Sequence, residues 1–507
     1  MSKSISSFLF ITLLTSGVLN AQERFLIQNV RLDAMRNAIM GDTLSNGERA
    51  HPNRTYVLQR GQRYVNTAAI VVNRYNLQLE GQPAPQSGDP GPAVVQFAPD
   101  SAGEYDTDRL LDLHGDASIT NVWFLGWVRG GHQIWEPILE ESDSAHLHLD
   151  HCVFEWMRGP AVHVTGKWST TYLTNSLVRN AIYANEWWAG RVVYYTAPAD
   201  SLIEVNNTVE NVGFGLLQSQ GIGLNYFFCD HNTVVNCAKF CFLESYYKEA
   251  YIANNLFVNC HFTGERMQDR PRQDPDMLLF GQTINLDTLK SKARQLTPSE
   301  AVKLYGTNAV IFVDGKTLSR NDPHELERTV VYGNNATYFD TTDFYPFYRL
   351  YNDTVKSKSG LILPEPVMND RTIRMFAWHP HMINMGSVEG EDPRFVKMPQ
   401  NTELIFAFLT DRYSPNPKDN VLWGYDPDSL TDSSAEVSSQ DITMFYNNSS
   451  SGVYPTPEDF SYSNSKLLSA GINGFPVGDL NWFPRELAVW NVGVDKHVLN
   501  QLSSDGK

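Results

Sequence analysis

A short asparagine-bounded motif recurs along the middle of the chain, each time after a short apolar strand. Its clear copies are Asn175-Ser-Leu-Val-Arg-Asn180, Asn207-Thr-Val-Glu-Asn211, Asn232-Thr-Val-Val-Asn236 and Asn255-Leu-Phe-Val-Asn259, with weaker copies at Asn121, His151 and Asn335. The last three clear copies start 25 and 23 residues apart. A period of this length is typical of stacked coils, because each coil is too small to bury its own hydrophobic face.

The physical chemistry of the motif specifies how such coils stack. Short strands pair in parallel with the coils above and below, and alternate apolar side chains point inward. Asparagine suits the corners, since its short amide tolerates left-handed backbone and can bond to the equivalent Asn of the next coil. Val212, Cys237 and Cys260 follow the motif and are expected to form an internal column. The repeat therefore predicts an all-β chain folded as a right-handed parallel β-helix, a solenoid.

The strand pattern on either side of these coils predicts the domain organisation. We expect residues 22–49 to form an N-terminal cap and residues 50–340 to form the β-helix. The repeat breaks after Glu265, and residues 266–328, which are rich in charge and proline, are expected to be a lateral insertion. Strand-like sequence resumes at Thr329. Residues 341–507 are expected to be a loop-rich C-terminal segment that closes on the β-helix.

The first residues of the chain have the pattern of an export signal. Lys3 supplies a positive charge, residues 8–14 form a short apolar run, and Leu19-Asn20-Ala21 is a small-residue cleavage site. We therefore interpret residues 1–21 as a signal peptide. No later stretch approaches the roughly 20 apolar residues that a transmembrane helix requires. The sequence predicts a secreted protein, whether extracellular, at the cell surface or in the periplasm, without a membrane span.

Charge and cysteine content restrict the partners further. The formal net charge of -17 disfavours nucleic acid as a partner. It also opposes an anionic polymer, unless a local basic patch or a bound cation intervenes. The five cysteines are an odd number, and we expect most to be buried thiols. Cys237 and Cys241 alone suggest zinc, but no second Cys or His pair stands at ligand spacing.

The motifs together resemble the secreted right-handed parallel β-helix proteins of the pectate-lyase-like superfamily, in particular the uncharacterised subgroup found in Bacteroidota. The resemblance rests on the Asn coils, the opening Val57-Leu-Gln-Arg-Gly61, the segment Asp392-Pro-Arg-Phe395, and the ending from Gly474 to Trp482. It covers most of residues 50–485. The coils indicate the fold strongly and the activity weakly, because this architecture carries lyases, hydrolases, esterases, adhesins and inert scaffolds.

The resemblance implies a carbohydrate-active protein whose partner is an extracellular polysaccharide. Lyases of this superfamily use a Lys or Arg base and commonly Ca²⁺, which neutralises the uronate carboxylate, although their motifs do not match this chain position by position. The leading hypothesis is a polysaccharide lyase that acts by β-elimination on a uronate-containing polymer. The alternative is a non-catalytic polysaccharide-binding or structural component of a cell-surface complex.

Stacking the coils by their Asn motifs places several polar residues on one outer face. We interpret Lys248, Arg191 and His163 as catalytic candidates, because elimination needs a base together with a group that stabilises developing negative charge. Gln218 is a substrate-binding candidate, and Glu244 is a candidate ligand for Ca²⁺. The competing interpretation is that outward positions of any β-helix are polar for structural reasons.

Aromatic and histidine residues accumulate in the same coils. Trp187 and Trp188 are substrate-binding candidates, because adjacent strand residues point to opposite faces and at least one ring should be exposed. Other tryptophans near these coils can equally belong to the core. The remaining residues of this kind are Trp123, Trp127, Trp135, Trp156 and Trp168, and the histidines His132, His146 and His148, whose spacing is a weak indication of a metal site.

Overall fold

The structure is a computed structural model of the whole chain. It describes residues 23–260 apart from short gaps at 74, 106–107, 129–131, 183–189, 214, 220–222, 239–240 and 244–246. It further describes residues 329–354, 381–399 and 454–490, and a few isolated residues between 278 and 405. The expected signal peptide and nearly all of the expected insertion therefore lie outside the described residues.

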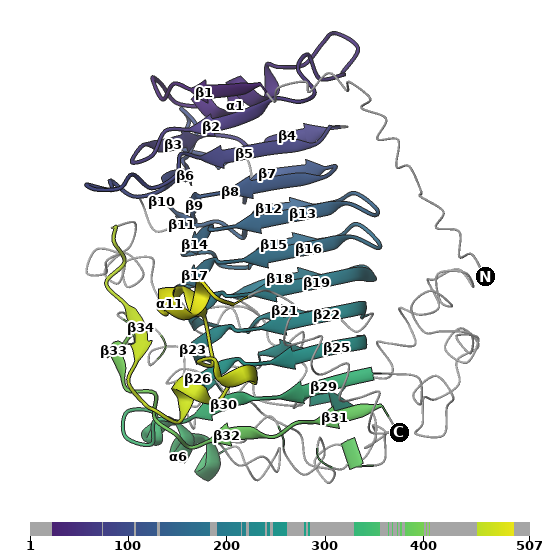
Figure 1. Cartoon of the computed structure of the whole chain (residues 1–507). Coiled ribbons are helices and arrows are strands. Elements are labelled where there is room, and N and C mark those ends of the chain that lie inside the picture. The colour runs from purple at the N-terminus through teal and green to yellow at the C-terminus, as the bar shows by residue number, and fades with distance from the viewer. Residues whose placement is uncertain are drawn as a thin grey trace, which may run out of the picture.

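Three long parallel sheets run the length of the molecule and confirm the predicted right-handed parallel β-helix (Figure 1). Sheet I contains β4 (Ile70–Asn73), β7 (Arg109–His114), β12 (Glu136–Glu140), β15 (Pro160–Val164), β18 (Arg191–Tyr195), β21 (Leu217–Gln218) and β24 (Phe242–Leu243). Sheet II contains β1 (Arg24–Ile27), β2 (Thr55–Leu58), β5 (Leu77–Gly81), β8 (Ala117–Thr120), β13 (His146–Asp150), β16 (Thr170–Thr174), β19 (Ala199–Val205), β22 (Leu224–Asp230), β25 (Tyr247–Ala253), β29 (Thr329–Gly333) and β31 (Met382–Asn384). Sheet III contains β3 (Arg63–Asn66), β6 (Ala93–Phe97), β9 (Val122–Leu125), β14 (Val153–Glu155), β17 (Leu177–Arg179), β20 (Thr208–Val212), β23 (Thr233–Cys237), β26 (Leu256–Cys260), β30 (Asn335–Tyr338) and β32 (Ser387–Glu389).

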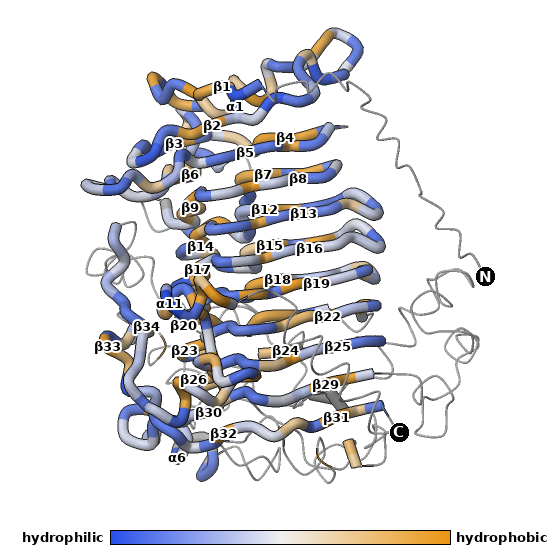
Figure 2. The backbone as a smooth tube through the Cα atoms, in the orientation of Figure 1, coloured by the Kyte–Doolittle hydropathy of each residue, from blue (hydrophilic) through white to orange (hydrophobic). Residues whose placement is uncertain are grey.

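Each full coil passes through sheet I, then sheet II, then sheet III. Alternate side chains point into a continuous apolar core, which includes Leu111, Val162 and Phe257. The same hydropathy pattern repeats from coil to coil (Figure 2). All five cysteines are buried and free, as predicted, and Cys237 pairs in register with both Val212 and Cys260.

The corner between sheets II and III contains the predicted asparagine ladder. The side-chain amide nitrogen of Asn207 donates to Oδ1 of Asn232 at 2.9 Å, and that of Asn232 donates to Oδ1 of Asn255 at 3.0 Å. Asn255 donates in the same way to Asn335 at 2.9 Å, across the expected insertion. Each ladder residue is fully buried. The residue before it takes the left-handed conformation, as Asn206 and Asn254 do, so two adjacent residues divide the roles that the sequence analysis assigned to one Asn.

A second ladder stands at the other end of sheet III. Asn211 donates to Asn180, Asn236 to Asn211, and Asn259 to Asn236, over 3.3, 3.0 and 3.0 Å respectively. Here each Asn is itself left-handed, with φ between 50° and 58°. Here a single Asn both tolerates the left-handed backbone conformation and bonds to the next coil. This explains why the motif ends with Asn as well as beginning with it.

Both ends of the solenoid extend past the clear repeats. Helix α1 (Ala34–Met40) lies at the N-terminal end and buries Met35 and Ile39 against the core. At the other end, β29 pairs directly with β25 and β30 with β26, so sheets II and III continue from residue 260 to residue 329 without a strand between them. Strands β31 and β32 add one more partial coil after residue 340. Helix α6 (Tyr345–Thr354) follows β30.

Residues 454–490, the C-terminal strap, run along the outer side of sheet III and the adjoining corner (Figure 1). The strap contains β34 (Asp459–Tyr462), which pairs antiparallel with β33 (Phe395–Lys397), then η2 (Leu467–Ser469), η3 (Ile472–Gly474), η4 (Leu480–Trp482) and α11 (Pro484–Leu487). Its backbone binds the left-handed corner residues one after another. Ile472 N–H donates to Asn254 Oδ1 at 2.9 Å, and Leu480 N–H donates to Asn206 Oδ1 at 3.3 Å.

The strap also encloses a charge cluster on the outer face of sheet III. Arg179 is fully buried and donates through Nε to Glu210 at 2.9 Å and through Nη2 to Glu458 of the strap at 2.6 Å. Its Nη1 lies 3.4 Å from Glu155. Burial raises the pKa of Glu210 to about 8, despite the neighbouring guanidinium. One cation thus serves three buried carboxyl groups, which ties the strap to the coils.

Candidate functional site

The outer face of sheet I brings together three of the predicted site residues. His163 lies on β15, Arg191 begins β18, and Gln218 ends β21. His163 is in register with Tyr194 of the next coil, and Tyr194 is in register with Gln218 of the one after. Side chains in one column of a parallel sheet repeat about every 4.8 Å. His163, Tyr194 and Gln218 therefore form a continuous line along the solenoid axis.

His163 is held by a buried carboxylate. Val162 and Val164 on either side pack in the core, so the imidazole points outward, with 16% of its side chain exposed. Its Nδ1 lies 2.7 Å from Oε2 of Glu136, which begins β12 and is buried. An ionised carboxylate only accepts hydrogen bonds, so the neutral ring carries its proton on Nδ1 and leaves Nε2 as the acceptor. Nε2 is 3.5 Å from the Thr196 hydroxyl.

Tyr194 and Arg191 form the next layer of the site. The rings of His163 and Tyr194 stack with centroids 4.7 Å apart. The guanidinium carbon of Arg191 lies 4.7 Å from the Tyr194 ring centroid and 5.9 Å from that of Trp135. These are cation–π distances, and they hold the Arg191 charge against the outer face although the residue is buried.

Near Tyr194 and Arg191, two further arginines lie close to acidic side chains. Arg109 Nη2 is 3.8 Å from Glu136 Oε1, and Arg158 Nη2 is 3.3 Å from Asp108. Together with Arg191, these side chains supply three guanidinium groups within one face. We name His163, Glu136, Tyr194, Arg191 and Gln218 the sheet I site. It is locally less negative than expected from a net charge of -17.

The other predicted residues are placed differently or not described. Lys248 lies on β25 of sheet II, half-buried, and thus not on the face that carries His163. Trp187, Trp188 and Glu244 lie outside the described residues. The expected Ca²⁺ ligand, Glu244, is therefore among the residues that are not described.

The remaining tryptophans and histidines divide between core and surface. Trp123, Trp127 and Trp156 are buried, so they do not offer rings to a ligand. His146 and His148 are exposed on β13, and His148 stacks on Tyr172 with ring centroids 4.2 Å apart.

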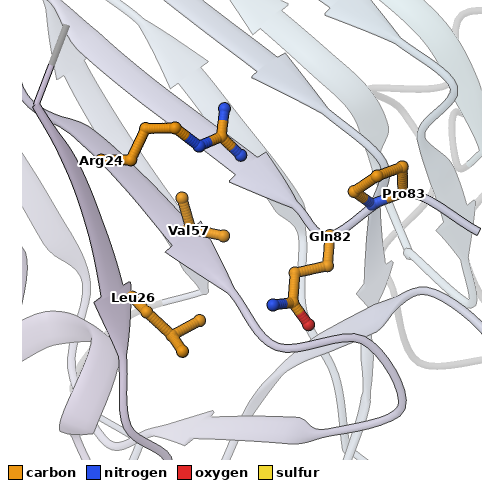
Figure 3. Close-up of a pocket in the computed structure, with 5 residues that line it drawn as sticks. All are labelled: Arg24, Leu26, Val57, Gln82 and Pro83. Atoms are coloured by element: carbon orange, nitrogen blue, oxygen red, sulfur yellow. The ribbon is translucent and has the colours of Figure 1, made fainter.

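A separate pocket of about 450 Å³ lies near the N-terminal end (Figure 3). Its lining residues are Arg24, Leu26, Val57, Gln82 and Pro83. Arg24 forms two hydrogen bonds with Glu80, at 2.6 and 2.8 Å. No group in this lining matches the His163 and Glu136 pair as an acid or base, so the pocket is not the preferred chemical site.

Sequence reasoning missed Glu136 and Tyr194. Glu136 stands two residues before the core residue Ile138, just as Pro160 stands two before Val162, and those two core residues pair in register. This register places Leu139 opposite His163, so the contact between Glu136 and His163 depends on how the side chains lie and has no signal in the sequence. Tyr194 pairs with His163, and aligning the coils by their inward apolar residues, rather than by the asparagines, would have found it.

No protein-family model matches the chain, and no curated protein matches it. Among the residues that the structure describes, no helix is long and apolar enough to cross a membrane. The chemistry must therefore be inferred from the sheet I site itself: an oriented imidazole, a phenol and guanidinium groups along a rigid outer face.

Proposed function

We propose that this chain is an exported carbohydrate-active protein that cleaves a uronate-containing polysaccharide by β-elimination at the sheet I site. The observation that carries the proposal is the 2.7 Å contact between His163 Nδ1 and the buried Glu136 carboxylate. A histidine whose Nδ1 is held in this way has Nε2 available to act as a general base. Its position along a continuous column also suits an extended polymer, which needs several subsites on one rigid surface.

The proposed reaction needs only side chains of this site. His163 Nε2 removes the proton on the carbon next to the uronate carboxylate, and the electrons of that C–H bond form the C4–C5 double bond. The C4–O bond breaks, and the Tyr194 hydroxyl supplies a proton to the leaving oxygen. Arg191, placed over the Tyr194 ring, stabilises the charge that develops on the carboxylate. A positioned acid or base contributes about 10²–10⁴-fold to such a step.

Two further parts of the proposal depend on residues outside this site. Export depends on residues 1–21, and the expected Ca²⁺ ligand is Glu244. The steps above do not use a metal ion.

The test measures unsaturated product by its ultraviolet absorbance. The mature protein is incubated with alginate, pectate and glycosaminoglycans, with and without Ca²⁺. We expect absorbance to rise on one polymer class, and His163→Ala to lower the rate about 100-fold or more. His146→Ala is the matched control, because His146 also lies near a carboxylate, with Nδ1 3.6 Å from Asp116, but is exposed on sheet II. A rate unchanged in His163→Ala, or lowered equally by both substitutions, excludes this site as the catalytic one.

The alternative function is a non-catalytic polysaccharide-binding or structural component of a cell-surface complex. The parallel, stacked rings of His148 and Tyr172 favour it, because they present an aromatic surface on the outer face of sheet II. No product on any polymer, together with retention of the protein by a glycan in affinity electrophoresis, would support binding. Loss of that retention in Tyr172→Ala would assign it to this stack.

A further inference from the structure

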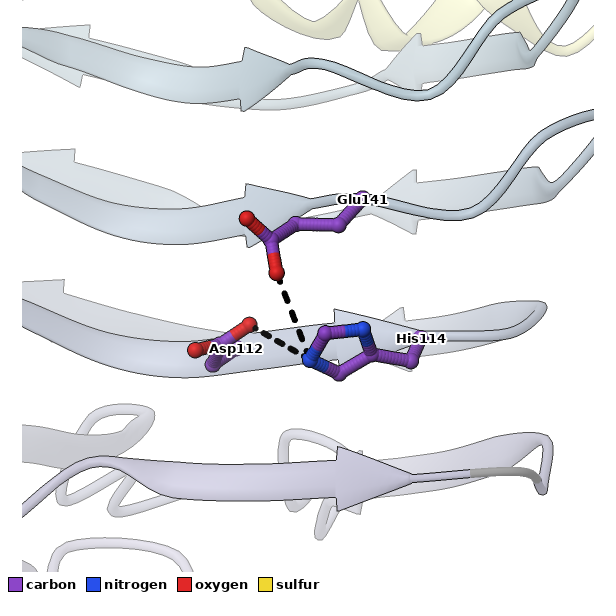
Figure 4. A group of neighbouring side chains, drawn as sticks. All are labelled: Asp112, His114 and Glu141. Carbon is purple, nitrogen blue, oxygen red and sulfur yellow. Dashed lines mark ion pairs between the residues drawn. The ribbon is translucent and has the colours of Figure 1, made fainter.

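A second polar group lies on the outer face of sheet I, toward the N-terminal end from His163. It consists of Asp112, His114 and Glu141 (Figure 4). His114 Nε2 is 3.1 Å from Asp112 Oδ1 and 3.4 Å from Glu141 Oε2. All three ligand atoms lie within 4.8 Å of one another. Both carboxylates therefore converge on a single ring nitrogen.

The strand register explains this convergence. Asp112 and His114 are alternate residues of β7, so both point outward while Leu111 and Leu113 enter the core. Asp112 pairs with Leu139 of β12, which brings Glu141, two residues farther on, opposite His114. The backbone thus presents three side chains at one point without any loop.

The spacing matches ligands that share one ion. Two donor atoms, each about 2.1 Å from a metal and at angles between octahedral and tetrahedral, lie roughly 3.0–3.4 Å apart. The two distances to His114 Nε2 fall in this range. Asp112 divides its oxygens: Oδ2 lies 3.6 Å from Arg109 Nη1, whereas Oδ1, which faces His114, is buried and has no hydrogen-bond partner among the described residues.

The neighbouring Glu140 is a buried carboxyl group that hydrogen bonds satisfy only in part. Its side chain is fully buried, Oε1 accepts from the Ser142 N–H at 2.7 Å, and Oε2 has no hydrogen-bond partner among the residues described. A cation bound by the adjacent Glu141 would bring positive charge close to this buried carboxyl group.

We propose that Asp112, His114 and Glu141 bind a divalent first-row transition-metal ion such as Zn²⁺. One imidazole and two carboxylates form a ligand set for zinc or its neighbours, and the imidazole disfavours Ca²⁺ and Mg²⁺, which prefer oxygen ligands. Tetrahedral coordination by three side chains leaves one position for water or a ligand. The site is therefore distinct from the Ca²⁺ site expected at Glu244.

The proposal does not depend on the proposed elimination chemistry. Asp112 and His163 occupy the same column of sheet I two coils apart, through Leu139. That separation is about 10 Å. An ion at His114 would add a fixed positive charge to the same outer face, where it would attract an anionic group of a bound polymer. Binding of the ion itself can be tested without any substrate.

The experiment titrates the mature, chelator-treated protein with ZnCl₂ in a calorimeter at pH 7.5, with CaCl₂ as a second titrant. We expect one saturable Zn²⁺ site per chain and no matching Ca²⁺ site. His114→Gln and Glu141→Gln, on different coils, should each weaken binding about tenfold or more. The thermal midpoint of the wild type should rise with Zn²⁺, and this rise should disappear in both variants.

His146→Gln is the matched control, because His146 also lies near an acidic partner, with Nδ1 3.6 Å from Asp116, but lies on sheet II. It should bind Zn²⁺ like the wild type. The proposal fails if no saturable binding occurs, in which case the three side chains make polar contacts only with one another. It also fails if both cluster variants retain the wild-type affinity, or if His146→Gln weakens binding as much as they do.

Discussion

The outer faces of sheets III and I are built from the same parallel strands but have opposite environments. On sheet III the outward column contains Glu155, Arg179 and Glu210, followed by Val235 and Val258, and the C-terminal strap covers it. On sheet I the corresponding face keeps His163 and Tyr194 partly exposed. An outward polar residue therefore has a structural role beneath the strap and is available for chemistry beside it.

The difference lies in how the charges are compensated. Arg179 meets three carboxyl groups that are inaccessible to bulk solvent, so removal of the cation leaves buried carboxyl groups without a partner. Arg109 on sheet I meets Glu136 and Asp112 at 3.8 and 3.6 Å with a third of its side chain exposed, so water can replace it. Residue type alone does not distinguish the two arginines. They differ because the C-terminal strap covers Arg179 and does not cover Arg109.

The largest expected effect is on this pair of arginines. Arg179→Met should lower the free energy of unfolding by about 3–5 kcal/mol, because it strands buried carboxyl groups. Arg109→Met should lower it by no more than about 1 kcal/mol. Urea unfolding followed by tryptophan fluorescence measures both. Equal losses in the two variants would remove the distinction between the covered and open faces.

A smaller effect concerns protonation beneath the strap. Burial raises the pKa of Asp479 to about 7, above its ordinary value of 3.8, although hydrogen bonds from Thr208 and Asn481 and the charge of nearby His231 oppose the rise. At a pH between 3.8 and about 7, Asp479 is therefore protonated in the folded state and ionised in the unfolded state, so folding takes up a proton. The free energy of unfolding should increase as the pH falls from 8 to 6, with Asp479 contributing about 1.4 kcal/mol.

The measurement is urea unfolding at pH 8 and pH 6 for the wild type, Asp479→Asn and Asp143→Asn. Asp479→Asn should show a pH dependence smaller by that amount, whereas substitution of the exposed Asp143 should leave it unchanged. Other buried carboxyl groups, such as Glu210, contribute to all three proteins alike. If Asp479→Asn keeps the full wild-type dependence, the strap does not bury an acid at this point.

The smallest expected effect is on the open face. His163→Ala should lower the free energy of unfolding by about 1 kcal/mol, because it removes one hydrogen bond from the buried Glu136 and one ring from the stack on Tyr194. The loss stays small because Arg109 still lies beside Glu136 and the imidazole is partly exposed. Thermal unfolding monitored by circular dichroism measures this. A loss of 3 kcal/mol or more would class His163 with Arg179, as a residue that maintains the fold.

The coils were predictable because their signals are local and periodic. Asn207, Asn232 and Asn255 each follow a short apolar strand at nearly constant spacing, and the structure places them in one ladder. The return of the chain at Thr329 was visible for the same reason, since its strand resembles β25 and pairs with it. The sheet I site was only partly predictable. His163, Arg191 and Gln218 could be named, whereas Tyr194 required the strand register and Glu136 required the tertiary structure.

The sequence by itself determined the repeat, the asparagine corners and the inward column of Val212, Cys237 and Cys260, because each depends on neighbours one coil away. The tertiary structure alone decided which outward residues are buried. Glu458 reaches Arg179 across 279 residues, and Ile472 reaches Asn254 across 218. No periodicity links such positions. The path of the strap over sheet III assigns Arg179 to the buried cluster, whereas the strap does not pass over β15 and His163 stays partly exposed.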